Sequence, residues 1–164
     1  MDFVNVDSLR EHGFEGFLTV AELTERHREI PDRMGVYLVV TPDGFDPQYV
    51  ERGTGGFFKG RDPNVSAAIL STAWVKGARV INIGKAGGAS SSSTLRKRLR
   101  QYIRFGQGQA VGHWGGRYIW QLHGCHSLLI CWKATEIEPR DVERDLIATF
   151  RKKFGARPFA NLQD

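Results

Sequence analysis

Two short runs of β-branched and aromatic residues, separated by amphipathic stretches, limit this chain of 164 residues to a small sheet with helices around it. Residues 35–40 (GVYLVV) and 80–84 (VINIG) have the length and composition of buried strands. Residues 116–122 (GRYIWQL) and 126–135 (HSLLICWKAT) add two further β-rich segments. Helical patterns are expected at residues 18–30, 65–75, 94–105 and 139–154.

The order of these elements is helix, strand, helix, strand, helix, strand, strand, helix. This order predicts an α/β (α+β) fold with a small mixed, mainly antiparallel central sheet flanked by helices. Residues 33–164 are expected to form one globular unit, because the length fits a single domain. Residues 1–32 are expected to form an N-terminal helical extension packed on that unit, with Thr19 as a helix cap.

Composition narrows the class of partner without deciding it. The formal net charge is +5, which suits a polyanion such as nucleic acid but also occurs in many domains without such a partner. Cys125 and Cys131 lie in one apolar run, which favours reduced structural thiols. The chain has no signal-peptide core and no apolar stretch near the roughly 20 residues that a membrane-spanning helix requires. We therefore expect a cytoplasmic protein without a membrane partner.

Strand alternation sets two polar side chains apart from their apolar neighbours. In the first strand, alternate apolar residues share one face and put Tyr37 on the other. In the second strand, Ile81 and Ile83 share a face and Asn82 points away from it. If the two apolar faces build one core, Tyr37 and Asn82 project from the same opposite surface. A tyrosine in this position is usually a cross-strand packing partner, so both interpretations stay open here.

The helix expected at 94–105 has an apolar stripe and a basic face. Leu95, Leu99, Tyr102 and Ile103 form the stripe at the helical period. Arg98 lies at the edge of this stripe, one turn before Tyr102, where it either covers apolar surface with its stem or serves a site. The basic face consists of Arg96, Lys97, Arg100 and Arg104.

The last helix places a carboxylate within its apolar stripe. Glu143 falls by angle between Phe150 and Phe154, where its charge would lose hydration. That costs several kcal/mol, about 2–7 for a polar group without a partner, unless the carboxylate is paired, protonated or bound to a metal. The sequence therefore predicts a partner for Glu143: an inward arginine in the structural case, a metal ion in the functional one.

Five segments, in order, resemble the GIY-YIG nuclease superfamily. Residues 35–37 (GVY) and 82–84 (NIG) resemble its two name-giving motifs. The stretch VINIGKA followed by LRKRLRQY is similar to the second strand and following helix of that family. VERDLI resembles its glutamate-bearing helix, and RPFAN the segment that ends in its asparagine. The resemblance spans roughly residues 33–161.

The resemblance implies roles for individual residues. It assigns catalytic roles to Tyr37, Lys85, Arg98, Tyr102 and His113, a metal-binding role to Glu143, and supporting roles to Gly35, Gly84 and Asn161. The chain departs from the family at Asn82, where the second motif has a tyrosine. Asparagine donates and accepts hydrogen bonds but does not lose a proton at ordinary pH. We therefore expect either reduced activity or another group, such as His113 or Tyr102, in the role of that hydroxyl.

The resemblance implies a metal-dependent endonuclease that uses one Mg²⁺ or Mn²⁺ and cuts nucleic acid, DNA being favoured over RNA. Tyr37 would orient or deprotonate the attacking water, with nearby positive charge favouring its phenolate. Arg98 would hold the phosphate, and the basic face together with Arg117 would grip the backbone. A homodimer is allowed but not indicated. Because of Asn82, the alternative is a catalytically impaired module of the same fold that binds nucleic acid or protein.

Overall fold

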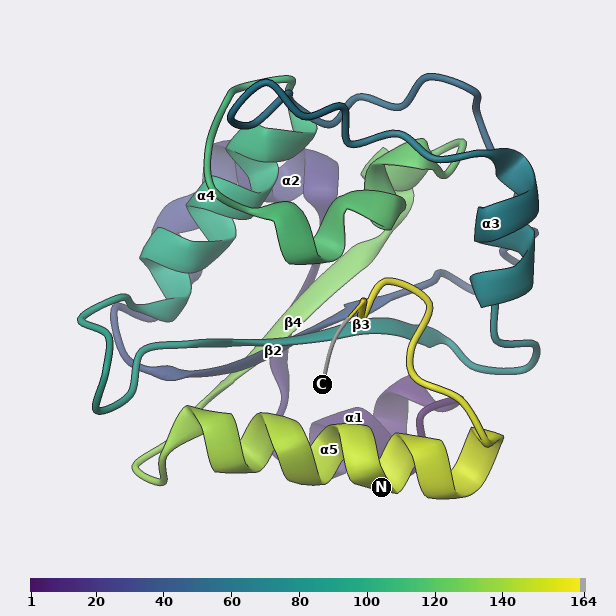
Figure 1. The fold of residues 1–164 in the computed structure, drawn as a ribbon. Coiled ribbons are helices and arrows are strands. Elements are labelled where there is room, and N and C mark those ends of the chain that lie inside the picture. Colours follow the sequence, from purple (N-terminus) through teal and green to yellow (C-terminus); the bar gives the residue numbers. More distant parts are fainter. Residues whose placement is uncertain (163–164) are drawn as a thin grey trace.

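Four strands form one sheet in the order β1-β4-β2-β3, and every pairing is antiparallel (Figure 1). The computed structural model describes residues 1–162, so the last two positions of the predicted unit 33–164 lie outside the described residues. The predicted fold class, a small sheet flanked by helices, is confirmed. The strands are β1 (Glu15–Thr19), β2 (Gly35–Val40), β3 (Val80–Ala86) and β4 (Leu129–Ala134).

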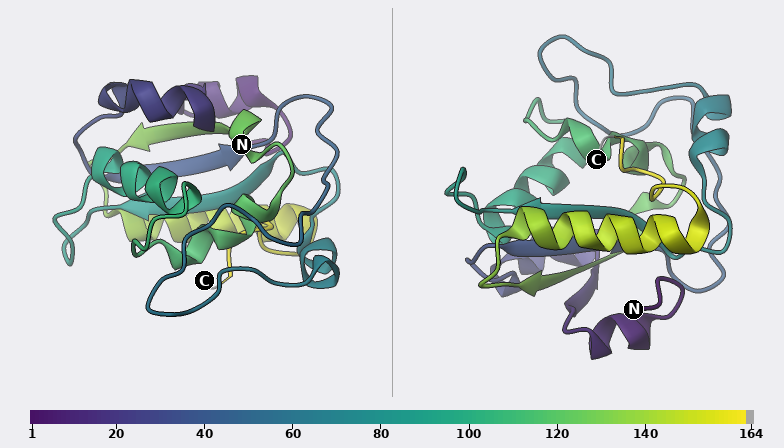
Figure 2. Two further views of the ribbon diagram at one scale, coloured as in Figure 1. Left: turned by 90° about the horizontal axis from the view of Figure 1, so that it is seen from above. Right: turned by 60° about the horizontal axis from the view of Figure 1, so that its bottom comes forward.

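Helices cover both faces of the sheet and enclose two apolar cores (Figures 1 and 2). The helices α2 (Val20–Arg26) and α4 (Leu95–Gly106) pack on one face, and α1 (Val6–Glu11) and α5 (Pro139–Phe154) pack on the other. A further helix, α3 (Ala67–Ala73), contributes Leu70 to the α4 side. The short 3₁₀ helices are η1 (His27–Glu29), η2 (Trp114–Gln121) and η3 (Cys125–Ser127).

Residues 1–32 contribute a strand to the sheet in addition to the expected helices. β1 pairs with β4 and forms one edge of the sheet. Its pattern is irregular because Phe17, at a φ of 52°, is an extra residue between two paired neighbours. A β-bulge of this kind interrupts the alternation by which a strand is found in sequence, so this strand was not predicted. The expected helices are present in residues 1–32, and the strand is an addition that the sequence analysis did not include.

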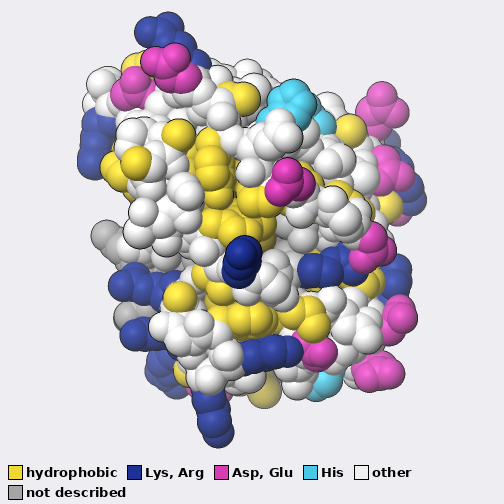
Figure 3. Space-filling model, turned by 90° about the vertical axis from the view of Figure 1, so that its right-hand side faces the viewer, with side chains coloured by type: hydrophobic (Ala, Val, Ile, Leu, Met, Phe, Trp, Pro, Cys, Tyr) yellow, Lys and Arg dark blue, Asp and Glu magenta, His cyan; other side chains and the backbone are white. Residues whose placement is uncertain are grey.

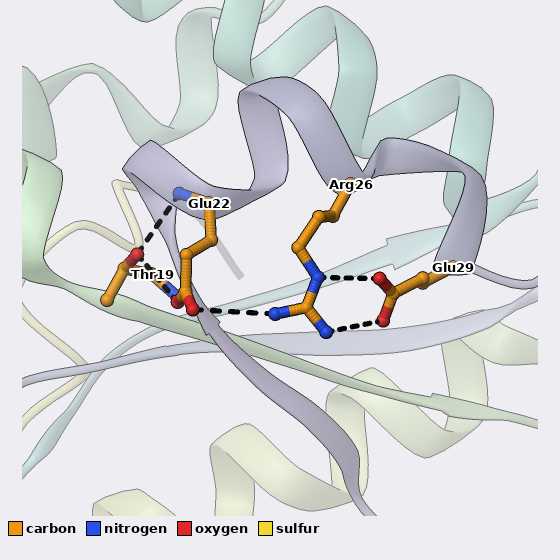
Figure 4. Close-up of polar contacts among 4 residues, drawn as sticks. All are labelled: Thr19, Glu22, Arg26 and Glu29. Carbon is orange, nitrogen blue, oxygen red and sulfur yellow. Dashed lines mark hydrogen bonds and ion pairs between the residues drawn. The ribbon is translucent and has the colours of Figure 1, made fainter.

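Thr19 caps a helix as predicted, although the helix is shorter than expected. Its side chain accepts a hydrogen bond from the Glu22 backbone N–H, and the Glu22 carboxylate accepts one in return from the Thr19 N–H (Figure 4). This reciprocal capping box ends β1 and begins α2. Arg26 then bridges Glu22 and Glu29, where α2 passes into η1 (Figure 4).

A bulge in β3 changes the predicted faces of that strand. Val39 pairs with Asn82 and Val40 with Val80, which leaves Ile81 without a partner. Ile81 consequently joins the core under α4, whereas Ile83 joins the core over α5. The prediction that these two isoleucines share a face is wrong for this reason. Asn82, paired beside Val39, does lie on the Tyr37 face of the sheet, as predicted.

The segment predicted as a strand at 116–122 is a 3₁₀ helix instead. η2 buries Tyr118, Ile119, Trp120 and Gln121 consecutively, so its burial does not alternate. A short continuous apolar run has no period that separates a buried strand from a buried helical segment. The Gln121 side chain also bonds backbone groups of Val50, Glu51 and Val65, which fixes the long loop before α3.

The helices predicted from periodicity at 94–105 and 139–154 are confirmed. All four residues of the predicted stripe of α4 are buried, and Ile147 and Phe150 of α5 are buried against the other face of the sheet. The helix predicted at 65–75 is α3, which is capped by Ser66. Cys125 and Cys131 are free, buried thiols, as expected. Among residues 1–162, no helix has the length and apolar character needed to cross a membrane.

Candidate active site

Tyr37 lies over a glycine at the open edge of the sheet. It pairs with Gly84 of β3, the edge strand, and a Cβ atom built on Gly84 would overlap the Tyr37 phenol. The missing side chain therefore gives the phenol room to reach across β3 toward the sheet edge. Gly35, at the start of β2, is required for packing, because a Cβ there would overlap the Lys133 carbonyl.

A cleft of about 670 Å³ runs along the β3 edge. α4 borders it from one face of the sheet through Arg98, and α5 borders it from the other through Glu143. The sequence-predicted residues that line this cleft are Tyr37, Asn82, Gly84, Lys85, Arg98, His113, Arg117, Glu143 and Asn161. The cleft thus brings together residues that lie far apart in the sequence, such as Tyr37 and Asn161, which are 124 positions apart.

Tyr102 lies behind the cleft and does not line it. Its side chain is fully buried, and its ring packs against the His113 ring with centroids 4.2 Å apart. Its ring also packs against the Trp120 ring with centroids 5.1 Å apart, and its hydroxyl donates a hydrogen bond to the Gly116 carbonyl at 3.4 Å. Tyr102 therefore supports His113 from below, which is a positioning role and not the direct contact that the resemblance implied.

His113 and Tyr37 contact each other through polar atoms. His113 Nε2 lies 3.4 Å from Tyr37 Oη, and both side chains are at most 2% exposed. The other ring nitrogen, Nδ1, is buried without a hydrogen-bond partner among the described residues. Burial, reinforced by the Arg98 charge, lowers the pKa of His113 well below its ordinary value. The imidazole is therefore neutral at physiological pH, and burial disfavours its protonated form.

Burial also governs the Tyr37 phenol. Desolvation raises the pKa of Tyr37, the Arg98 charge opposes the rise, and Glu143 adds to it. The Arg98 charge favours the phenolate, as expected, but loss of hydration outweighs it, so the pKa of Tyr37 is raised on balance. Tyr37 is a neutral phenol beside a neutral imidazole. Any proton that leaves it has an acceptor at 3.4 Å.

Glu143 has the partner that its position predicts, but that partner is a lysine. Glu143 Oε2 lies 3.3 Å from Lys85 Nζ, and the two side chains are 20% and 37% exposed. Burial raises the pKa of Glu143 above its ordinary value despite the opposing charges of Lys85, Arg98 and Arg140. More positive charge near this carboxylate would stabilise its ionised form.

The residues at Glu143 fit a divalent ion of the kind that binds through few protein ligands. Among residues 1–162 no cluster of three or more His, Cys, Asp or Glu side chains has the arrangement of a metal site. Mg²⁺ commonly binds one or two carboxylates and completes its shell with water and substrate phosphate. The Glu143 carboxylate opens on the cleft and matches that requirement in its ionised form, which burial disfavours and a bound cation would favour.

Asn161 fastens the C-terminal segment to the outer edge of β3. Its side-chain amide accepts a hydrogen bond from the Ile83 N–H at 2.9 Å and donates one to the Ile83 carbonyl at 2.8 Å. The Ala160 N–H adds a bond to the Ile81 carbonyl at 2.8 Å. An edge strand leaves such groups unpaired, so this segment completes the hydrogen bonding of β3 beside the cleft.

Replacing Asn161 with alanine is expected to lower the free energy of unfolding by about 1–3 kcal/mol, since it leaves the half-buried Ile83 N–H and carbonyl without partners. Urea denaturation monitored by circular dichroism measures this change. Gln101→Ala, at an exposed position of α4, is the control and is expected to change stability by less than about 0.5 kcal/mol. Equal stability of the two variants would contradict a structural role for Asn161.

The five residues predicted to bind nucleic acid differ in what they contact. Arg96 donates to the backbone carbonyls of Ile30 and Arg28, and it thereby joins α4 to η1. Arg104 bonds Gln109 at 2.7 Å. Three of the five, Lys97, Arg100 and Arg104, are exposed on α4, and of the five only Arg117 lines the cleft.

Some residues of the cleft were not singled out in the sequence, among them an arginine and a tryptophan. Arg61 and Trp114 line the cleft together with Tyr37. Arg61 comes from the glycine-rich turn region after β2, whose conformation the sequence left open. Trp114 directly follows His113, so the aromatic and glycine-rich surroundings of that histidine were the available signal.

The buried neutral state of His113 predicts an acid-dependent loss of stability. Its pKa is lowered on folding, so below about pH 6.5, the ordinary pKa of histidine, the unfolded state binds more protons than the folded state. Stability must then fall as the pH falls, by at most about 1.4 kcal/mol per pH unit for one proton. We expect the free energy of unfolding, measured with urea at pH 7 and at pH 5.5, to fall less in His113→Gln than in the unmodified protein. Equal losses would contradict a buried, neutral His113.

Comparison of the chain with protein-family models, with curated proteins and with solved structures finds no match.

Proposed function

We propose that this protein is a metal-dependent endonuclease that hydrolyses phosphodiester bonds of nucleic acid, with DNA favoured over RNA. The observation that supports the proposal most is the meeting of Tyr37, Lys85, Arg98, His113 and Glu143 in one cleft. These side chains come from two strands, two helices and a loop, and they include two cations, a metal-suited carboxylate and a proton acceptor. The resemblance of these positions to the GIY-YIG nucleases supports the same reaction.

Water activation is assigned to Tyr37 and His113. The Tyr37 oxygen accepts a proton from the attacking water while its own proton passes to Nε2 of the neutral His113, 3.4 Å away. The resulting hydroxide attacks phosphorus, the P–O bond to the leaving oxygen breaks, and solvent protonates that oxygen. The phenol stays neutral overall, so the reaction avoids a free phenolate but forms an imidazolium at His113, a state that burial and the Arg98 charge disfavour.

Charge stabilisation at phosphorus is assigned to Arg98 and to the ion at Glu143. The planar guanidinium of Arg98 suits two phosphate oxygens at once. A divalent cation held by Glu143 would supply Lewis-acid charge on the phosphate and the leaving oxygen. Lys85, now paired with Glu143 at 3.3 Å, is free to turn toward phosphate when another cation neutralises the carboxylate.

A path for the nucleic-acid backbone extends from the cleft on both sides. Lys85 lines the cleft and also two neighbouring hollows. One hollow lies along α5 and is lined by Arg140 and Arg144. The other lies beside the serine loop and is lined by Arg98. Figure 3 views one flank of the molecule and shows Lys and Arg side chains gathered along its lower left margin. Positive charge on this side suits sequence-independent contacts with phosphates.

Asn82 supports one alternative function. It lines the cleft on the Tyr37 face, where the resembling motif has a tyrosine, and it is only 4% exposed. If the missing hydroxyl is essential, the protein is a nucleic-acid-binding module of the same fold without hydrolysis. The two buried thiols fit a reducing compartment, so a cytoplasmic location is proposed with either function.

Incubation of the purified protein with supercoiled plasmid and Mg²⁺ or Mn²⁺ tests the proposal. The nuclease predicts conversion to nicked circles that requires the metal and stops with a chelator. Absence of nicking with both metals, combined with retained binding to the plasmid, would contradict hydrolysis and favour the binding module.

A further inference from the structure

A tight hairpin carries Arg61 into the cleft. Phe58 and Arg61 pair as a two-residue hairpin, with backbone hydrogen bonds in both directions. Its central residues, Lys59 and Gly60, have φ values of 52° and 71°. Two consecutive positive φ values define a type I′ turn, which is unfavourable for a lysine at the first position. The hairpin therefore holds a defined, mildly strained shape, as often occurs near functional sites.

Arg61 and Arg117, the arginine pair, converge on one tryptophan. The guanidinium carbon of Arg61 lies 4.8 Å from the centre of the Trp114 ring, and that of Arg117 lies 4.6 Å from it. Arg117 also contacts the Tyr118 ring at 5.1 Å. All of these side chains line the same cleft as Tyr37 and Arg98. Cation–π contacts fix planar guanidinium groups in position before any ligand arrives.

The arginine pair lacks a negative partner. Within residues 1–162, neither guanidinium is ion-paired with a carboxylate, and the buried Arg117 Nε has no hydrogen-bond partner. Burial, aided by the Arg61 charge, lowers the pKa of Arg117. Arg61 is exposed and Arg117 is partly buried. Two like charges held close together repel each other, which is unfavourable unless an anion binds between them.

We propose that the arginine pair and Trp114 form a second phosphate-binding site, which takes a backbone phosphate of the strand whose scissile phosphate lies at Arg98. The inference rests on the proposed function, since it names how the nuclease holds its substrate. A strand that enters the cleft at Arg98 continues past the arginine pair, and planar donors match phosphate oxygens bidentately. The site is sequence-independent, because phosphate carries no base identity.

Binding of fluorescein-labelled DNA without metal, in the presence of EDTA, tests this site separately from cleavage. Fluorescence anisotropy is measured with a single strand and with the matching duplex, over a series of chloride concentrations. We expect about a tenfold loss of affinity for each of Arg61→Ala and Arg117→Ala. The slope of log K against log salt is expected to fall by about 1 for each arginine removed.

Arg10→Ala is the matched control, because Arg10 also stacks on an aromatic ring, that of Phe17 at 4.5 Å, but belongs to α1 on the other face of the sheet. We expect its affinity to stay within about twofold of the unmodified protein. The double variant Arg61→Lys/Arg117→Lys keeps the charge and the fold while losing the planar donors, and it is expected to lie between the unmodified protein and the double alanine variant.

The proposal would be overturned if the double alanine variant bound DNA with the affinity and salt slope of the unmodified protein, or if the unmodified protein bound neither probe. Because the assay contains no metal, its result is independent of hydrolysis. Loss of DNA binding in the variants, together with an absence of plasmid nicking by the unmodified protein, would support the phosphate-binding site and contradict only the nuclease. Plasmid nicking by the unmodified protein, together with unchanged DNA binding in the double alanine variant, would support the nuclease and overturn the phosphate-binding site.

Discussion

Glu143→Gln and Arg98→Ala are each expected to reduce plasmid nicking by about a hundredfold or more, which corresponds to about 2.7 kcal/mol of transition-state stabilisation. The amide keeps the size of the Glu143 side chain but loses the charge that a divalent cation requires. Arg98 borders the cleft beside Tyr37, and its removal takes away the planar donor assigned to the phosphate. Initial nicking rates at saturating Mg²⁺ or Mn²⁺ measure both effects.

The two variants are distinguished by their dependence on metal. Glu143→Gln is expected to need a higher metal concentration, whereas Arg98→Ala is expected to keep the metal requirement of the unmodified protein at a lower rate. Glu25→Gln, the same exchange at an exposed position of α2, is the control and is expected to nick normally. Equal residual cutting by all of these proteins would identify a contaminating nuclease and remove the catalytic assignment.

Gly84→Ala is expected to impair both the site and the fold. A Cβ atom at this position would overlap Tyr37 Cζ and Oη, so the phenol must move away from His113. Forcing an extra carbon into such a packed position costs about 1–3 kcal/mol of stability. Displacing a reacting group by about 1 Å reduces the rate by roughly a hundredfold. Urea denaturation and nicking rates measure the two consequences separately.

Gly115→Ala provides the matched comparison, because Gly115 lines the same cleft but has open space where its Cβ would lie. We expect this variant to have the stability of the unmodified protein to within about 0.5 kcal/mol. If Gly84→Ala proved as stable and as active as Gly115→Ala, the Tyr37 phenol could not lie across β3 as described.

Periodicity predicted the elements that bury one clear face. α4 and α5 were found from their apolar stripes, and Thr19 was found as a cap because its chemistry is local. Local irregularity accounts for the errors. The extra residues Phe17 and Ile81 break the alternation of β1 and β3, and a bulge is determined by the neighbouring strand more than by the residue itself.

The site was predictable where a residue was out of place in its own element. Glu143 was recognised because a carboxylate within an apolar stripe needs a partner. That its partner is Lys85 depends on how α5 packs beneath β3, which no local pattern encodes. The net shift in the pKa of Tyr37 was not predictable for a similar reason: the depth of burial, which outweighs the nearby charge of Arg98, is a property of the assembled fold.

Residues on loops were the least predictable part of the site. Arg61 reaches the cleft only because Lys59 and Gly60 turn the chain back, and Trp114 meets it only because η2 is helical. Loop geometry depends on distant contacts such as those of Gln121 with the backbone at Val50 and Val65. The sequence offers no period or motif for such contacts.

The anomalous diffraction of Mn²⁺-soaked crystals tests most directly whether the cleft at the β3 edge is a metal-dependent catalytic centre. We predict one manganese peak beside the Glu143 carboxylate, with Lys85 turned away from it and the Tyr37 and Arg98 side chains facing the same space. Manganese bound only elsewhere on the surface, with the Lys85–Glu143 ion pair intact at saturating metal, would contradict the assignment.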